Sequence, residues 1–153
     1  MTLRPTDEEA RDLAKSLISN AHFGSIAVNH PETGHPHVTR IAVGTDRSGT
    51  PITLISDLSL HTKALKENPI CSLLLGEPLD KGDPLTHPRL TLSAKAIWTA
   101  KPELRDHFLK THPKAKRYID FADFNFVTFQ IISGDLNGGF GKAYHLSADD
   151  FGP

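Results

Sequence analysis

Five polar side chains gather at one point of the sequence, where an apolar stretch ends and a short helix is expected to begin. They are Ser56, Ser59, His61, Thr62 and Lys63. A new helix leaves its first backbone N–H groups unpaired and carries partial positive charge at its N-terminus, so a phosphate is favoured there. The hydroxyl, imidazole and ammonium groups add further donors. This spacing indicates an anion site; a capped surface helix joining two strands is the alternative.

Two apolar strands position this helix. The first is predicted over residues 52–56, and Ser59 is the expected N-cap of the helix that follows it. Asn68 and Pro69 then end the helix, because a residue before proline disfavours helical geometry. The next strand, Ile70–Leu75, is almost continuously apolar, which predicts burial on both of its faces.

The rest of the chain predicts an N-terminal helix followed mostly by strands. Thr6 and Glu9 form a capping-box pattern at the start of that helix. Further strands are expected at 23–28, 38–43, 90–99 and 126–132, with a helical insertion around 102–120. The strand over 38–43 should turn through 44–51 and pair with 52–56. After residue 132 we expect a glycine-rich segment and a short polar tail.

Short strands joined by hairpin turns, with helices inserted rather than alternating, indicate a mainly β fold. We expect an antiparallel barrel with peripheral helices in a single domain over residues 1–153. A dinucleotide-binding fold is not supported, because the run Gly138–Gly141 lacks the G-x-G-x-x-G spacing and opens no helix.

Composition narrows the class of protein. The formal net charge is −1, which does not favour nucleic acid or an acidic membrane surface as a partner. Cys71 is the single cysteine and lies in an apolar run, as expected for a buried, reduced thiol. No apolar run has the length of a signal peptide core or a bilayer span, so we expect a cytoplasmic location.

Several segments of the chain resemble those of a known protein family. The run ISDLSLHTKALKENPICSLLL is similar to the strand–helix–strand signature of FMN-binding split-barrel proteins related to pyridoxamine 5′-phosphate oxidase. The runs DPLTHPRLTLSAKA, HPKAKRYIDFADF and GGFGKA resemble the haem-utilisation proteins of that fold. The resemblance implies an antiparallel split β-barrel that forms a homodimer, with FMN at the interface between subunits.

The resemblance also implies particular cofactor-binding residues. They are Arg40, Ile41, Ala42, Val43, Ser56, Ser59, His61, Thr62, Lys63 and Arg89, the last reaching the flavin of the neighbouring subunit. The basic pair that the family places at the helix start falls here on Leu60 and His61. Bound flavin would carry the redox chemistry, and no catalytic residue of the protein is singled out.

Histidines support an alternative cofactor. No pair has the H-E-x-x-H spacing of a helical zinc site, so no metal site is predicted. The haem-utilisation resemblance makes His145 the candidate axial ligand of a haem, with Asp123 as a partner of His61. Three functions stay open: an FMN-dependent oxidoreductase acting on an unidentified small molecule, a haem-binding or haem-degrading protein, and a dimeric binding protein without a cofactor.

Overall fold

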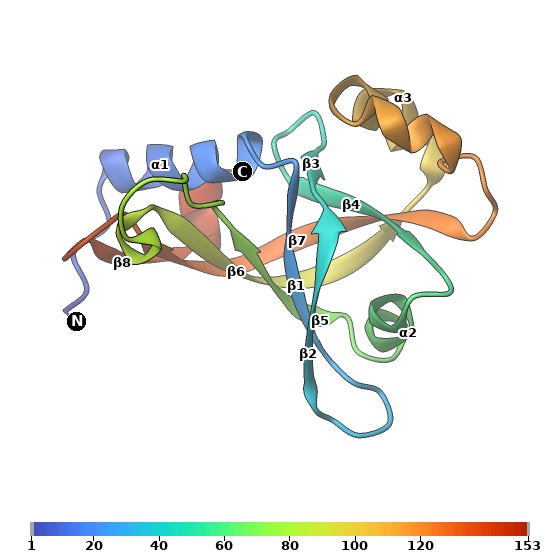
Figure 1. The fold of residues 1–153 in the computed structure, drawn as a ribbon, viewed down its shortest axis with the longest axis horizontal. Coiled ribbons are helices and arrows are strands. Elements are labelled where there is room, and N and C mark those ends of the chain that lie inside the picture. Colours follow the sequence, from blue (N-terminus) through green and yellow to red (C-terminus); the bar gives the residue numbers. More distant parts are fainter. Residues whose placement is uncertain (1, 153) are drawn as a thin grey trace.

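Alternating buried and exposed residues produce most of the strands of this protein, and a computed structural model describes how residues 2–152 combine them (Figure 1). The strands are β1 (Phe23–Asn29), β2 (Pro36–Ala42), β3 (Gly44–Thr45), β4 (Pro51–Ser56), β5 (Ile70–Leu75), β6 (Arg89–Thr99), β7 (Phe124–Asn137) and β8 (Ala143–Ser147). The helices are α1 (Glu8–Ser19), α2 (Leu60–Glu67) and α3 (Lys101–Thr111), with 3₁₀ turns η1 (Pro84–Thr86), η2 (Pro113–Arg117) and η3 (Ala148–Phe151). None of these helices is long and apolar enough to span a bilayer.

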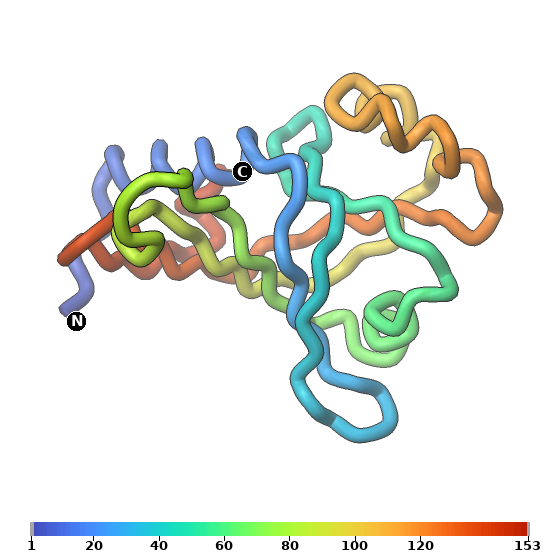
Figure 2. Tube along the Cα trace, in the orientation of Figure 1, coloured from blue at the N-terminus to red at the C-terminus, as the bar shows by residue number. Residues whose placement is uncertain are grey.

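The strands form one curled antiparallel sheet. Their order is β2-β1-β5-β6-β7-β4-β3, and β8 pairs with the far half of β7. Figure 2 shows β6 and β7 running along the length of the molecule, with the β1–β2 hairpin projecting from it. The expected antiparallel split barrel is therefore confirmed.

Two apolar clusters hold the sheet and helices together. The larger one fills the barrel and includes Ile26, Leu73, Leu92 and Phe129, with Ile18 of α1 packed onto it. The smaller one lies under α3 and η2. Each strand of the barrel turns alternate side chains into the larger cluster, so its other face is left for solvent or a partner.

Two expectations about strands are wrong. β2 pairs along its whole length with β1, and only the two residues of β3 continue it to pair with β4. β5 is buried on one face only, since Ile70 and Leu74 are 50% and 46% exposed. Apolar composition alone does not reveal which face of a strand is covered, because the covering element comes from elsewhere in the chain.

The two ends of the chain also differ from expectation. Asp7, rather than Thr6, caps α1 by accepting a 2.8 Å hydrogen bond from the N–H of Ala10. The Thr6 hydroxyl instead donates to the carbonyl of His145. The predicted polar tail contains β8, which antiparallel pairing attaches to an extended β7. The helical insertion agrees with α3 and η2.

Candidate functional site

The junction between β4 and α2 is built around a buried hydrogen bond. Thr62 is completely buried, and its hydroxyl donates to the carbonyl of Ser56 over 2.6 Å. This bond ties the first turn of α2 to the last residue of β4. Thr62 therefore positions the helix start, and its hydroxyl is already engaged within the protein.

Ser56 is also committed to the architecture of the junction. Its hydroxyl donates to Oδ2 of Asp123 over 2.7 Å and accepts from the N–H of Leu58. The carbonyl of Asp123 accepts a 2.7 Å hydrogen bond from the N–H of Asp57. The expected partnership of Asp123 with His61 is therefore replaced by one with Ser56, because Asp123 precedes β7, which lies directly beside β4.

Three side chains at the helix start remain available. Ser59 is the N-cap by position but makes no capping bond through its hydroxyl. Among the residues that the structure describes, His61 and Lys63 have no side-chain hydrogen bond or ion pair. Burial lowers the pKa of His61, and the nearby His37 lowers it further. The neutral imidazole is thus favoured, and Lys63 supplies the positive charge of this turn.

The predicted residues of β2, and Val43 directly after it, divide between core and surface. Ile41 and Val43 are buried in the larger cluster, whereas Ala42 is half-buried and its carbonyl accepts a hydrogen bond from Thr53. Arg40 is exposed, and its guanidinium lies 5.4 Å from the centre of the Phe23 ring. Within this chain Arg40 thus contacts an aromatic ring and makes no bond to the β4–α2 junction.

The sheet register brings Arg40 onto the same face as two other predicted site residues. Arg40 lies opposite Ser25, Ser25 opposite Leu74, and Leu74 opposite Thr91; the row then continues to Asp135 and His145. Arg89 precedes Thr91 by two residues and therefore shares its face. Directly opposed residues also point to one face. Arg40, Arg89 and His145 consequently lie on the outer face of the sheet.

His145 has a carboxylate partner that the sequence did not reveal. Its Nδ1 lies 2.8 Å from Oδ1 of Asp135, the residue directly opposite it on β7. Both side chains are more than half exposed, at 53% and 64%. Recognising the alternating residues of β8 as a strand is the one signal that would have paired them. Arg89, by comparison, donates to the carbonyl of Leu85 over 3.1 Å and so holds η1.

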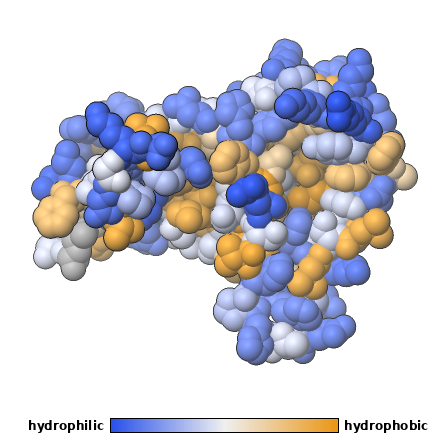
Figure 3. Space-filling model, in the orientation of Figure 1, coloured by the Kyte–Doolittle hydropathy of each residue, from blue (hydrophilic) through white to orange (hydrophobic). Residues whose placement is uncertain are grey.

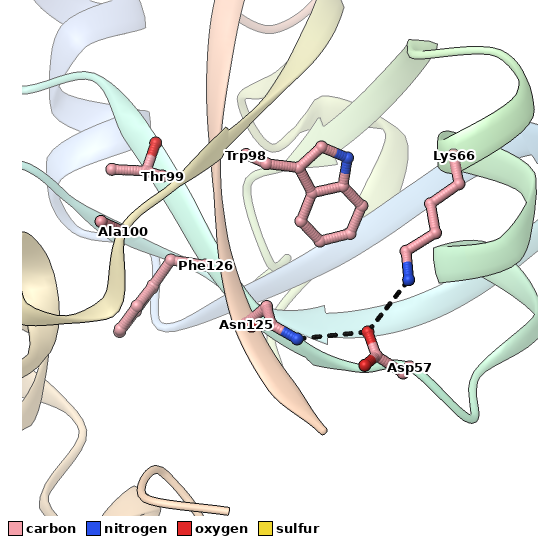
Figure 4. A pocket seen from close by; sticks show the side chains of 7 residues that line it. All are labelled: Asp57, Lys66, Trp98, Thr99, Ala100, Asn125 and Phe126. Carbon is pink, nitrogen blue, oxygen red and sulfur yellow. Dashed lines mark hydrogen bonds and ion pairs between the residues drawn. The ribbon is translucent and has the colours of Figure 1, made fainter. Parts of the chain in front are cut away.

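A shallow pocket of about 390 Å³ is lined by Asp57, by Lys66 of α2 and by residues of β6 and β7 (Figure 4). Oδ1 of Asp57 accepts from Nζ of Lys66 at 3.3 Å and from Nδ2 of Asn125 at 3.2 Å. Lys66 also lies 5.7 Å from the centre of the Trp98 ring. Because every charge here is paired, we interpret this cluster as a support that holds α2 against β6 and β7.

Polar and apolar side chains occupy different parts of the molecular surface. Figure 3 shows a polar tip on the β1–β2 hairpin and apolar side chains gathered above it, over the middle of the molecule. Exposed apolar residues of the sheet include Phe23, Val38 and Leu74. Within residues 2–152, no group of three or more His, Cys, Asp or Glu side chains is arranged to hold a metal ion.

Comparisons with known proteins agree with this architecture. The chain is 36% identical over 101 residues to a chloroplastic heme oxygenase, HOZ, of Arabidopsis thaliana; the match covers 63% of this chain and 30% of that protein. A heme-binding protein of Mycobacterium smegmatis superposes with a TM-score of 0.85 at 26% identity, covering 98% of this chain and 61% of that one. The chain thus spans less than two thirds of either relative.

A third similarity concerns the fold alone. A protein of Clostridium acetobutylicum related to general stress protein 26, of the pyridoxinephosphate oxidase family, has a TM-score of 0.73 at 15% identity. The alignment covers 95% of this chain and 99% of that one. The resemblance to split barrels is confirmed, and a family model matches residues 5–152: the chain belongs to the family described as CREG, beta-barrel.

Proposed function

We propose that this protein binds haem on the outer face of its sheet, with His145 as the ligand of the iron. The observation that carries the proposal is the contact between His145 Nδ1 and Asp135 Oδ1 at 2.8 Å. A histidine that ligates a metal commonly donates its other ring N–H to a carboxylate, which fixes the tautomer and raises the basicity of the ligating nitrogen. Nε2 of the exposed His145 is then the free nitrogen.

A charge on the same face suits the rest of the ligand. Haem carries two propionates, and Arg89 supplies a guanidinium group that pairs well with a carboxylate. Arg89 and His145 stand on β6 and β8, two strand spacings apart, and are offset by two residues along the strands, which together gives about 12 Å. That separation is comparable with the dimensions of a porphyrin. Bound haem would supply the iron chemistry; the protein's own residues ligate and orient it.

The relatives support the same choice. The Arabidopsis protein is a heme oxygenase and the mycobacterial protein is a heme-binding protein, and both exceed 25% identity to this chain. We infer that this chain shares the binding of haem with these two relatives.

We further propose that the protein is a homodimer that buries this outer face. Val38, Leu74 and Phe23 are 64%, 46% and 42% exposed, which is unusual for large apolar side chains on adjacent strands. A two-fold axis parallel to the sheet at Leu74, midway between Arg40 and Asp135 in the row, would bring Arg40 of one copy toward Asp135 of the other. Such an interface is self-complementary in charge, as two-fold contacts require.

A haemin titration tests the proposal. Wild-type protein should give a saturable Soret shift, and His145→Ala should lose it, whereas His35→Ala in the exposed β1–β2 turn should behave as wild type. An unchanged spectrum for His145→Ala removes His145 as the ligand. Circular dichroism of each variant separates loss of the ligand from loss of the fold.

FMN is the second candidate, and the unengaged side chains of Ser59, His61 and Lys63 favour it. They surround the N-terminus of α2, where a phosphate is stabilised. In this case the protein would be a flavin-dependent oxidoreductase acting on an unidentified small molecule. Quenching of FMN fluorescence by the protein, lost in Lys63→Ala, would support it. A protein that responds to neither haemin nor FMN would instead be a cofactor-free dimeric binding protein.

A further inference from the structure

The edge of β7 is open in its middle. β4 pairs with β7 over Phe124–Thr128, and β8 pairs with the same edge over Ser133–Asn137. Residues 129–131 therefore have a strand partner, β6, on one side only, and Ile132 is the extra residue of a β-bulge with no β6 partner. Such an unpaired edge is a template for another extended segment.

The backbone groups along this opening are unsatisfied by the rest of the protein. In an antiparallel strand, the N–H and C=O of a residue point to the same edge, and successive residues alternate between edges. One or two of residues 129–131 thus point both groups into the opening, and the bulge at Ile132 interrupts the alternation. In the described part of the chain, no loop or turn forms a backbone hydrogen bond to them.

A cavity of about 920 Å³ lies at this opening. Its walls come from α1, the β3–β4 turn, β7 and η3, and its lining includes the apolar side chains of Ile18, Ile131 and Phe151. The ion pair between Arg11 and Asp150, at 2.8 Å, holds η3 against α1 and keeps that wall in place. The volume is in the range of small-ligand pockets.

Two opposite charges line the cavity without partners. Lys15 and Asp149 both contribute to the lining, and neither forms a side-chain hydrogen bond or ion pair within residues 2–152. A ligand with one carboxylate and one ammonium group would satisfy both. Gln130, also in the lining, adds an amide.

We propose that this cavity binds a di- or tripeptide with free termini, which adds to the open edge of β7 as a short strand. Backbone pairing is the means by which extended peptides add to sheet edges, and pockets accept their alternate side chains. The length follows from the register. Ile52 lies opposite Thr128 and Ser147 opposite Ser133, so Pro51 and Ala148 come opposite positions 129 and 132. The gap between them holds two residues, so a dipeptide pairs in full and a tripeptide has one residue beyond the pairing. The site is independent of the proposed haem function.

The test is a titration of ¹⁵N-labelled protein with trivaline and with an equimolar mixture of free tripeptides. The amide signals of residues 129–132 should shift, and the amides whose N–H points into the opening should gain protection from hydrogen exchange. Trivaline N-methylated on its backbone should bind at least tenfold more weakly, because it cannot donate to the edge. Acetylated and amidated trivaline should also lose affinity, because it lacks the charges that meet Asp149 and Lys15.

A variant tests the location of the site. Ser19 is an exposed α1 residue in the cavity lining, and Ser19→Trp should obstruct the cavity and weaken or abolish the shifts. Asp12→Trp is the matched control, because Asp12 is exposed on the same helix and outside the lining. The spectrum of each variant reports whether it folds. Absence of shifts at residues 129–132 with both probes, or equal binding of the N-methylated peptide, overturns the proposal.

Discussion

The hydroxyl of Thr62 and the carbonyl of Ser56 are joined by a buried 2.6 Å hydrogen bond, which fixes where α2 starts relative to the end of β4. Replacing the hydroxyl by a methyl group removes this bond, and the Ser56 carbonyl keeps only the 3.1 Å bond from the N–H of Ser59. Thr62→Val should therefore lower the free energy of unfolding by about 0.5–1.5 kcal/mol, measured by chemical denaturation. Thr62→Ser, which keeps the donor, should lose less. Equal stability of Thr62→Val and wild type would contradict this role.

Leu60 stands at the start of α2, where the split-barrel resemblance implies a basic residue. Leu60→Arg adds a charged donor beside the unpaired N–H groups and should tighten FMN binding about tenfold, a gain of about 1.4 kcal/mol. Glu67→Arg is the control, because Glu67 is at the opposite end of the same helix. Fluorescence quenching titrations measure both. Equal gains from the two variants would indicate general electrostatic attraction rather than a site at the helix start.

Asp135 holds the ring of His145 through Nδ1, so its charge should govern the strength of iron ligation if haem binds there. Asp135→Asn keeps the size of the side chain and removes the charge. We expect haemin affinity to fall about 10- to 100-fold, as for other partners of metal-bound histidines. Asp12→Asn, on the exposed face of α1, should have no effect. Unchanged affinity in Asp135→Asn would show that this carboxylate does not contribute to ligation of the iron by His145.

The pKa of His61 is lowered, first by burial and then by His37. The unfolded chain therefore takes up a proton at higher pH than the folded protein. Stability should be greatest above the ordinary histidine pKa of about 6.5 and should fall as the pH drops from there through the lower, folded pKa.

Denaturation curves on both sides of that pH measure this effect. His61→Gln should remove part of the decrease seen in wild type, and His37→Gln should reduce it less, because burial is the larger cause. His35→Gln, in the exposed turn, should leave the decrease intact. A decrease identical in His61→Gln and wild type would be inconsistent with the lowered pKa.

Leu74 is 46% exposed in the middle of the outer face of the sheet. If a second copy covers that face, Leu74→Lys should dissociate the dimer, because a charge would be buried against an apolar surface. Sedimentation velocity measures the change, and the Leu74→Lys monomer should keep the far-ultraviolet spectrum of the fold. Leu58→Lys provides a control at an exposed apolar residue in the turn between β4 and α2, outside the sheet. A wild-type monomer would exclude the proposed homodimer.

Local signals in the sequence predicted the central strand–helix–strand segment well. The strand that contains residues 52–56 ends at Ser56, α2 follows Ser59, and β5 begins directly after Pro69. Proline and the apolar periodicity act on their immediate neighbours, so they can be interpreted without the rest of the chain. Burial of Cys71, whose pKa is raised to about 12, followed from the same apolar run.

The pairing of distant segments was beyond the sequence. In the sequence, the residues of β8 resemble a polar tail, whereas in the structure they pair with β7 and place His145 opposite Asp135. Likewise, β2 pairs with β1, although the sequence predicted pairing with β4. Register depends on contacts between residues far apart in the chain, and one residue of slip moves every side chain to the other face.

By itself, then, the sequence determined the split-barrel class, the β4–α2 junction and the residue types available for a cofactor. Only the tertiary structure decided which of those residues share a surface. It placed Arg40, Arg89 and His145 on the outer face of the sheet, and it committed Thr62 and Ser56 to internal hydrogen bonds. The physical reason is that helix and turn propensities are local, whereas strand pairing and burial arise from the whole chain packing together.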